Sequence, residues 1–328
     1  MNNDTEQKEL INLGAIQQMQ GNFDVAESYY KKAFELNAQN VTLLNNRGML
    51  FYQQNCFTEA RSQFEKAIEI DPENVTAWLN LGNTLVFLNE FEQAVNAYGQ
   101  SLQLQPLQAE AWEGLAKLYM LNDEFAAAEK CWAHAIDNEP NDPELLLGLA
   151  QVYLSTGKPG DARQLAEHVL SQYPQNGRAL QTAGLAHLLD KNFGLAIVFF
   201  RQYLALFPGD TAVRNHLALT LLQTGNTEAA ASEFEAILTI DADNGEARLN
   251  AGVICLSLTK YEDALAHFDY ALEKNPAQNK ARFYRGVTLG FLDRKPEAAA
   301  VFGELAAGNN DDWAAQSRQQ LEILNGAG

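Results

Sequence analysis

Apolar residues recur along the whole chain with the spacing of amphipathic α-helices, at positions i, i+3, i+4 and i+7. This helical pattern itself repeats every 34 residues, and an alanine marks the same place nine times in succession. These alanines are Ala26, Ala60, Ala94, Ala128, Ala162, Ala196, Ala230, Ala264 and Ala298. A fixed period of this length predicts a tandem array of equal two-helix units in place of a single globular core.

Small and aromatic residues keep the same phase as the alanines. Glycine or alanine stands twelve residues before each alanine, as at Gly48 and Gly82, and an aromatic residue stands four residues after it in eight units, as at Phe64 and Tyr98. The fifth unit has Ala166 at that place. Because small residues let two helices approach closely, we expect each aromatic ring to fill the space against the next unit.

Turn-forming residues separate the predicted helices. Glycine or asparagine stands five residues before the alanine in five units, where a left-handed residue would end the first helix, at Gly21, Asn55, Asn89, Gly157 and Gly225. Proline follows the second helix and stops it in six units, at Pro72, Pro106, Pro140, Pro174, Pro208 and Pro276.

These boundaries define the predicted organisation of the chain. The nine units cover residues 7–312, with starts near residues 7, 41, 75, 109, 143, 177, 211, 245 and 279. Residues 1–6 form a polar N-terminal tail in this prediction. Residues 313–328 form a capping helix and tail, with the helix started by Asp311-Asp312 at the end of the last unit and running through about Leu324.

Two stretches carry a family resemblance. The segment Trp78-Leu79-Asn80-Leu81-Gly82, followed by Ala94, Tyr98 and Pro106, resembles the tetratricopeptide repeat family, and Trp112, Leu115, Tyr119, Ala128, Trp132 and Pro140 resemble it again. The resemblance implies an all-α fold, a right-handed superhelical α-solenoid of antiparallel helix pairs with a C-terminal capping helix. It also implies that the first helix of each repeat lines a concave binding face through repeat positions 2, 5, 6, 9, 12 and 13.

Mapped onto this chain, the positions implied by the family form a candidate peptide-binding groove with two unlike halves. Asparagine at position 6 is found in family members that hold extended peptides, because a primary amide can both donate to and accept from a peptide backbone. Leucine and valine prevail in the second half. The candidate groove residues are Asn12, Asn46, Asn80, Asn83, Lys117, Leu185, Leu189, Leu219, Leu222, Asn250 and Val253.

Each half of the candidate groove has a second interpretation. The asparagines equally fit the ordinary family pattern without a ligand. The leucines also fit a core between repeats, but we expect them to be exposed on the groove wall, where they would receive an amphipathic helix from a partner or from a second copy of the chain. Position 5 carries no lysine, so the family's clamp for acidic C-termini is not expected.

The net charge of -19 narrows the choice of partners. It disfavours nucleic acid and anionic membrane surfaces, both of which need clusters of Lys and Arg. The longest strongly apolar stretch, Phe193–Phe200, is too short to span a bilayer, and the N-terminal residues form no signal core. We therefore expect a cytoplasmic protein that binds a protein or peptide segment, basic or amphipathic in character. The acidic surface by itself fits a role in solubility better than a preference for basic partners.

Candidate chemistry is absent from the sequence pattern. No phosphate-binding, dinucleotide or hydrolase motif occurs, and three cysteines do not make a disulfide framework. We expect no catalytic residue, cofactor or metal ion, and interpret the chain as an interaction adaptor or scaffold. Two alternatives stay open: a chaperone or accessory subunit of a secretion or assembly system, and a substrate-presenting subunit of an enzyme on another chain.

Overall fold

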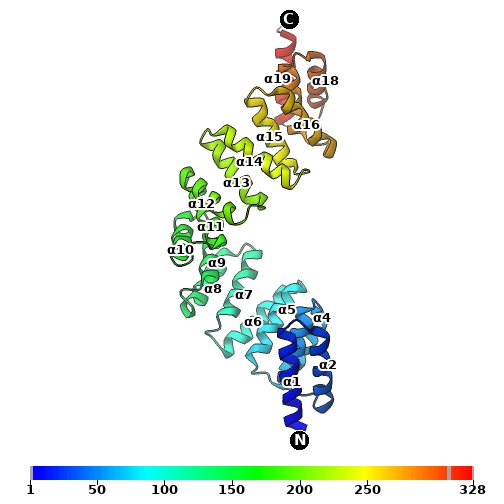
Figure 1. Ribbon diagram of the computed structural model, residues 1–328, viewed down its shortest axis with the longest axis vertical. Coiled ribbons are helices and arrows are strands. Elements are labelled where there is room, and N and C mark those ends of the chain that lie inside the picture. Colours follow the sequence, from blue (N-terminus) through cyan, green and yellow to red (C-terminus); the bar gives the residue numbers. More distant parts are fainter. Residues whose placement is uncertain (1–2, 309–311, 327–328) are drawn as a thin grey trace. The chain divides into compact units, whose positions relative to one another are not determined.

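The structure, a computed structural model, describes residues 3–308 and 312–326, and within these residues it contains nineteen α-helices and no strand (Figure 1). Successive helices form antiparallel pairs, and the chain divides into two compact units, Met1–Val169 and Leu170–Gly328. The all-α solenoid of tandem helix pairs expected from the sequence is therefore confirmed.

The first unit contains the helices of repeats one to five. Its helices are α1 (Asn3–Met19), α2 (Phe23–Leu36), α3 (Val41–Gln53), α4 (Phe57–Ile70), α5 (Val75–Phe87), α6 (Phe91–Leu104), α7 (Ala109–Leu121), α8 (Phe125–Asn138) and α9 (Pro143–Ser155). The division between the units falls inside α10 (Pro159–Gln172), the second helix of repeat five.

The second unit contains the helices of repeats six to nine and one further helix. Its helices are α11 (Gly177–Leu189), α12 (Phe193–Leu206), α13 (Thr211–Gln223), α14 (Thr227–Ile240), α15 (Gly245–Ser257), α16 (Tyr261–Lys274), α17 (Asn279–Phe291), α18 (Lys295–Ala306) and α19 (Asp312–Gly326).

The start of the first helix corrects one sequence expectation. From repeat two onward, each first helix begins at the residue where the period places the repeat start, for example α3 at Val41 and α5 at Val75. However, α1 begins at Asn3, so residues 3–6 are helical and not a tail. Asp4 and Glu6 in its first turn favour this extension, because carboxylates stabilise the positive end of the helix dipole. The rest of the predicted tails, residues 1–2 and 327–328, and Asp311 lie outside the described residues.

Every first helix is followed by a residue with left-handed backbone. The nine such residues, with φ between 58° and 76°, are Gly21, Asn55, Asn89, Asp123, Gly157, Lys191, Gly225, Thr259 and Asp293. The sequence pattern identified the five glycines and asparagines. The other four, notably Lys191 and Thr259, accept a conformation that costs about 1–2 kcal/mol for an ordinary L-residue, because the helix packing on both sides fixes the turn.

The start of most first helices is capped by a side chain. In α5, for example, Asn74 Oδ1 accepts a hydrogen bond of 3.0 Å from the backbone N–H of Ala77. Such a cap satisfies a helix N–H group that has no partner within the helix, and it stabilises the helix by about 1 kcal/mol. The asparagines and aspartates before six of the first helices therefore define those repeat starts, as the left-handed residues define the turns.

The aromatic column forms the core of the array. Its eight rings are almost fully buried, with Tyr98 2% and Trp132 3% exposed. In its own repeat, Tyr98 lies against Gly82, where an added Cβ atom would come within 2.7 Å of the ring. The small residue in the first helix therefore makes room for the aromatic ring of the second helix. The sequence alone indicated only that small residues let the two helices approach closely.

Helix α19 covers the last helix pair, as expected of a capping helix. It packs on α17 and α18, and Ala314 and Ser317 have no exposed surface. The ring of Trp313 lies 5.3 Å from that of Phe283 in α17. The apolar face of repeat nine is therefore shielded without a tenth repeat.

Candidate functional site

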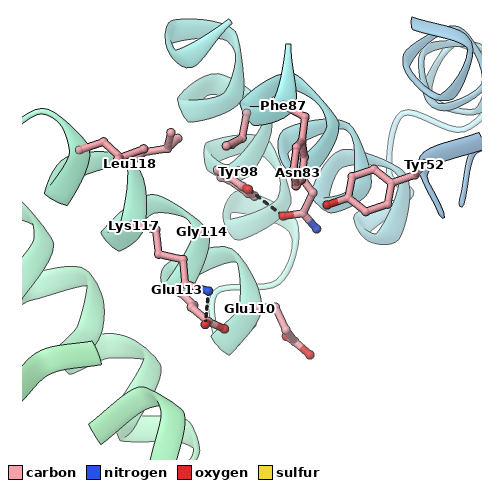
Figure 2. A pocket seen from close by; sticks show the side chains of 11 residues that line it. Tyr52, Asn83, Phe87, Tyr98, Glu110, Glu113, Gly114, Lys117 and Leu118 are labelled. Atoms are coloured by element: carbon pink, nitrogen blue, oxygen red, sulfur yellow. Dashed lines mark hydrogen bonds and ion pairs between the residues drawn. The ribbon is translucent and has the colours of Figure 1, made fainter. Parts of the chain in front are cut away.

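The first helices of the first unit lie side by side and share one face. Each of α1, α3 and α5 contacts the first helix of the following repeat, ending at α7. A pocket of about 380 Å³ opens on α3, α5 and α7 and has α6 at its floor (Figure 2). It is lined by Tyr52, Asn83, Val86, Phe87, Tyr98, Glu110, Glu113, Gly114, Lys117, Leu118 and Leu121.

One wall of the pocket is aromatic. Phe87, at the end of α5, is 55% exposed although it stacks on Phe57 with ring centres 4.6 Å apart and planes 8° apart. The ring of Tyr52 meets both of them edge-on, at 5.6 Å from Phe57 and 5.4 Å from Phe87. Burial raises the pKa of Tyr52, so its hydroxyl stays neutral. These rings offer a fixed apolar surface to a ligand, and Leu121, 67% exposed, extends it.

The opposite wall comes from α7, which carries charged groups as well as the apolar Leu118 and Leu121. Glu110, Glu113 and Lys117 are three and four residues apart, so they share one face of the helix. Lys117 Nζ lies 2.6 Å from Glu113 Oε1, and Figure 2 shows this ion pair at the pocket wall. Glu110 is exposed and makes no ion pair among the described residues. The wall therefore presents two carboxylates and one ammonium group.

The floor of the pocket is the buried phenol of Tyr98. Its hydroxyl donates a hydrogen bond of 2.7 Å to Asn83 Oδ1, and this bond fixes the Asn83 amide at the pocket wall. Burial raises the pKa of Tyr98 far above its usual range, so the hydroxyl remains a donor. Gly114 of the next repeat leaves room for the ring, because an added Cβ atom would come within 2.5 Å of it.

The contact at Gly114 explains the broken row at repeat position 6. This position packs on the aromatic residue of the preceding repeat: Asn46 lies beside the Tyr30 phenol, whose pKa burial raises and Asn46 lowers, and Gly148 adjoins Trp132. In the second unit, His216 stacks on Phe200 at 5.9 Å and Tyr284 on Phe268 at 6.0 Å. The residue that fits at position 6 therefore depends on the aromatic residue of the preceding repeat.

The asparagines chosen from the sequence are unequally accessible. Asn12 is exposed, Asn46 and Asn250 are half-buried, and Asn80 is buried with 8% of its surface exposed. Asn83 lines the pocket, as does Lys117. The structure thus brings Asn83 and Lys117 together at one site, whereas Asn12, Asn46 and Asn80 differ too much in exposure to act as a uniform row.

The apolar residues chosen in the second unit also differ in exposure. Leu189, at the end of α11, is 55% exposed. Leu185, Leu219 and Leu222 are half-buried and pack on the core around Phe200 and Phe234. Val253 is half-buried and packs on the core around Phe268. Four of the five therefore contribute to the repeat core, and Leu189 is the one with an exposed side chain.

Several pocket residues were not chosen from the sequence. Phe87 and Leu121 occupy repeat position 13, the same position as the candidate Leu189 of the second half. Glu113 is the only charged residue at position 5 in the nine repeats, and Lys117 is the only one at position 9. The one charged residue at each of these two repeat positions is the signal in the sequence that would have identified this face of α7.

The described residues contain no group of three or more His, Cys, Asp or Glu side chains placed to hold a metal ion. Burial raises the pKa of the Cys131 thiol to about 11, which keeps it protonated and unreactive at neutral pH. Within the same residues, none of the helices is both long and apolar enough to cross a bilayer.

The chain matches two families of known proteins. Residues 4–249 match the family described as the Cilia and flagella-associated protein 70 C-terminal domain, and residues 256–312 match the tetratricopeptide repeat. The mouse aspartyl/asparaginyl beta-hydroxylase is 24% identical over 90 residues, which are 27% of this chain and 12% of that protein. The chain therefore corresponds to a small part of that relative, and the enzyme's activity is not carried over.

Solved structures share the fold. A tetratricopeptide repeat protein of Parabacteroides merdae superposes with a TM-score of 0.57 at 17% identity, covering 76% of this chain and 98% of that one. The Pseudomonas aeruginosa pilF protein superposes with a TM-score of 0.58 at 21% identity, covering 64% and 96%. At this level of identity the likeness concerns the arrangement of helices and not the ligand.

Proposed function

Because the chain belongs to the tetratricopeptide repeat proteins, and over residues 4–249 to the family of the cilia and flagella-associated protein 70 C-terminal domain, we propose that it is a non-catalytic interaction scaffold. Its ligand is an extended or helical segment of another protein, which lies on the face of the first helices. In the first unit this segment contacts the pocket between α5 and α7.

The observation that carries the proposal is the exposure of large apolar side chains beside charged groups in one pocket. Phe87 and Leu121 are 55% and 67% exposed, on first helices of adjacent repeats. Exposed apolar surface bordered by polar groups is characteristic of interaction sites. Rigid walls further favour binding, because the stacked rings lose little conformational freedom when a ligand arrives.

Affinity capture from the native cell tests this function. The full chain is immobilised as the wild type and as the double variant F87S/L121S, which removes the apolar surface of the pocket. We expect the wild type to retain a protein in a stoichiometric complex and the double variant to lose it, because apolar anchors at the centre of a site dominate its affinity.

The matched control is the double variant I70S/L104S. Ile70 and Leu104 are 43% and 39% exposed, on the second helices α4 and α6 of the same unit. It should retain the complex. Equal loss from both variants would place the binding surface elsewhere, and circular dichroism on each variant separates lost binding from lost fold.

A further inference from the structure

We infer that the pocket between α5 and α7 recognises a basic side chain, Lys or Arg, next to an apolar side chain in the bound segment. This inference rests on the proposed function and specifies its partner. The apolar side chain lies on Phe87 and Leu121, and the cation lies on the carboxylates of α7.

The first argument is that the combination of Glu110 and Glu113 occurs in this repeat alone, although position 2 also carries Glu144 and Glu246 in two other repeats. Of the nine residues at repeat position 5, Glu113 alone is charged, and the others are apolar or amide side chains. At position 2 of the same helix, Glu110 is exposed and makes no ion pair among the described residues. A second negative group beside Glu113 raises the local negative potential above that of one ion pair, and a cation lowers it.

The second argument concerns Lys117, which holds Glu113 in the free protein. The pair lies at the pocket wall, and the Lys117 side chain is 64% exposed, compared with 26% for Glu113. An exposed ion pair of this kind contributes little to stability, so exchanging its cation costs little. A ligand cation can therefore take the place of Lys117 on Glu113 while Lys117 turns to solvent.

The third argument is the position of the aromatic rings opposite these carboxylates. Lys and Arg carry long apolar stems, which pack on apolar surface while the charged head stays in a polar environment. The pocket offers both environments: Phe87 and Tyr52 on one wall and α7 on the other (Figure 2). An acidic side chain would meet two carboxylates and a single ammonium group already paired, so charge complementarity favours a basic one.

Peptide selection tests the inference. A phage-displayed library of random dodecapeptides is selected on the full chain, and the affinity of the enriched peptides is measured by fluorescence anisotropy. We expect enriched peptides to carry Lys or Arg beside a large apolar residue. The variant E110Q/E113Q should bind them about tenfold more weakly, since two exposed charge pairs are lost. The control E69Q/E92Q removes equal charge from exposed positions on α4 and α6 and should bind them as the wild type does.

The affinity of the variant K117Q for the selected peptides shows whether the bound side chain is basic or acidic. If a ligand cation replaces Lys117, K117Q binds the selected peptides as tightly as the wild type or more tightly. Weaker binding by K117Q, enrichment of acidic peptides, or equal binding by E110Q/E113Q and the wild type would overturn the inference while leaving the scaffold function intact. Failure to select any peptide, or equal binding of the selected peptides by F87S/L121S, would instead contradict the proposed site itself.

Discussion

Two exposed aromatic stacks occur at the same place in the repeat, one in each unit. In the first unit, Phe57 at the start of a second helix stacks on Phe87 at the end of the next first helix, 4.6 Å away. In the second unit, Tyr261 and Phe291 occupy the same repeat positions and stack at 5.1 Å with planes 2° apart. Phe87 is 55% exposed and Phe291 60% exposed.

The surroundings of the stacks differ although their geometry does not. The first stack is followed by α7, another first helix, whose Glu110, Glu113 and Lys117 complete a pocket. The second is followed by the capping helix α19, which packs on α17 and α18. Repeat geometry therefore creates the aromatic pair in both units, whereas the helix that follows at the place of the next first helix, α7 or α19, decides whether the pair becomes part of a pocket.

The largest effect is expected from filling the floor of the first pocket. Gly114→Leu should lower the free energy of unfolding by about 3 kcal/mol, because even its Cβ atom would lie 2.5 Å from the Tyr98 ring. Gly99→Leu is the matched control in the same unit, since a Cβ atom there meets nothing within 4 Å. Urea unfolding followed by circular dichroism measures both. Equal losses of stability in both variants would show that the contact with the Tyr98 ring is not the cause.

In the second unit, charge at two leucines should separate core from surface. Leu222→Glu should cost about 2 kcal/mol, because Leu222 packs on the core and a carboxylate there loses hydration. Leu189→Glu, at an exposed side chain, should change stability by no more than about 0.5 kcal/mol. Thermal unfolding compares them, with sedimentation as a test of self-association. A larger loss of stability from Leu189→Glu than from Leu222→Glu would show that Leu189 belongs to the core and Leu222 to the surface.

Removing one ring from each stack compares the two units directly. Phe87→Ala and Phe291→Ala should each lower stability by about 1 kcal/mol, since an aromatic pair contributes that much beyond its buried area. Only Phe87→Ala should weaken the binding of a ligand captured by the full chain. Loss of binding in both variants would assign a ligand contact to the second stack as well.

The smallest effect concerns pH and the second unit. Burial lowers the pKa of His216 and of His267, against the opposing attraction of Asp210 and Glu246 on the former and of Glu235 and Asp263 on the latter. The unfolded chain therefore binds protons more readily than the folded one. The stability that follows from this difference is present above the ordinary histidine pKa of about 6.5, and it is lost as the pH falls through the lowered folded values.

Urea unfolding at neutral and mildly acidic pH tests this expectation on the wild type and on H216Q/H267Q. The double variant should lose less stability on acidification than the wild type. The same fall in both proteins would assign the pH dependence to carboxylates, which are present in both.

The sequence was sufficient to predict the positions of the helices, but not which residues on them are accessible. The alanine period and the prolines fix where each helix lies, because they act within one repeat. Whether a groove residue is accessible depends on its neighbours: Asn80 is buried, whereas Asn12, in the first of the described helices, is exposed. Lys191 and Thr259 show the same limit, since their left-handed backbone follows from packing and not from their own preference.

The pocket was only partly predicted from the sequence, for a related reason. Asn83 and Lys117 were chosen because they occupy family groove positions, and they do line it. Phe87 was not a candidate, because leucine and valine prevail at the groove positions only in the second half of the chain. Its exposure depends on Phe57, thirty residues earlier, which holds one face of the ring and leaves the other open.

The pairing of each ring with position 6 of the following repeat restricts how this chain can gain or lose repeats. Duplication or deletion of 34 residues keeps the helical register, yet it brings a new pair of residues into contact. Loss of residues 109–142 would bring Gly148 behind Tyr98, in the place of Gly114. Loss of residues 75–108 would instead bring Gly114 behind Phe64, where Asn80 now stands, and open a gap. The order of the repeats therefore matters, and recombination between them is constrained by residue size at each joint.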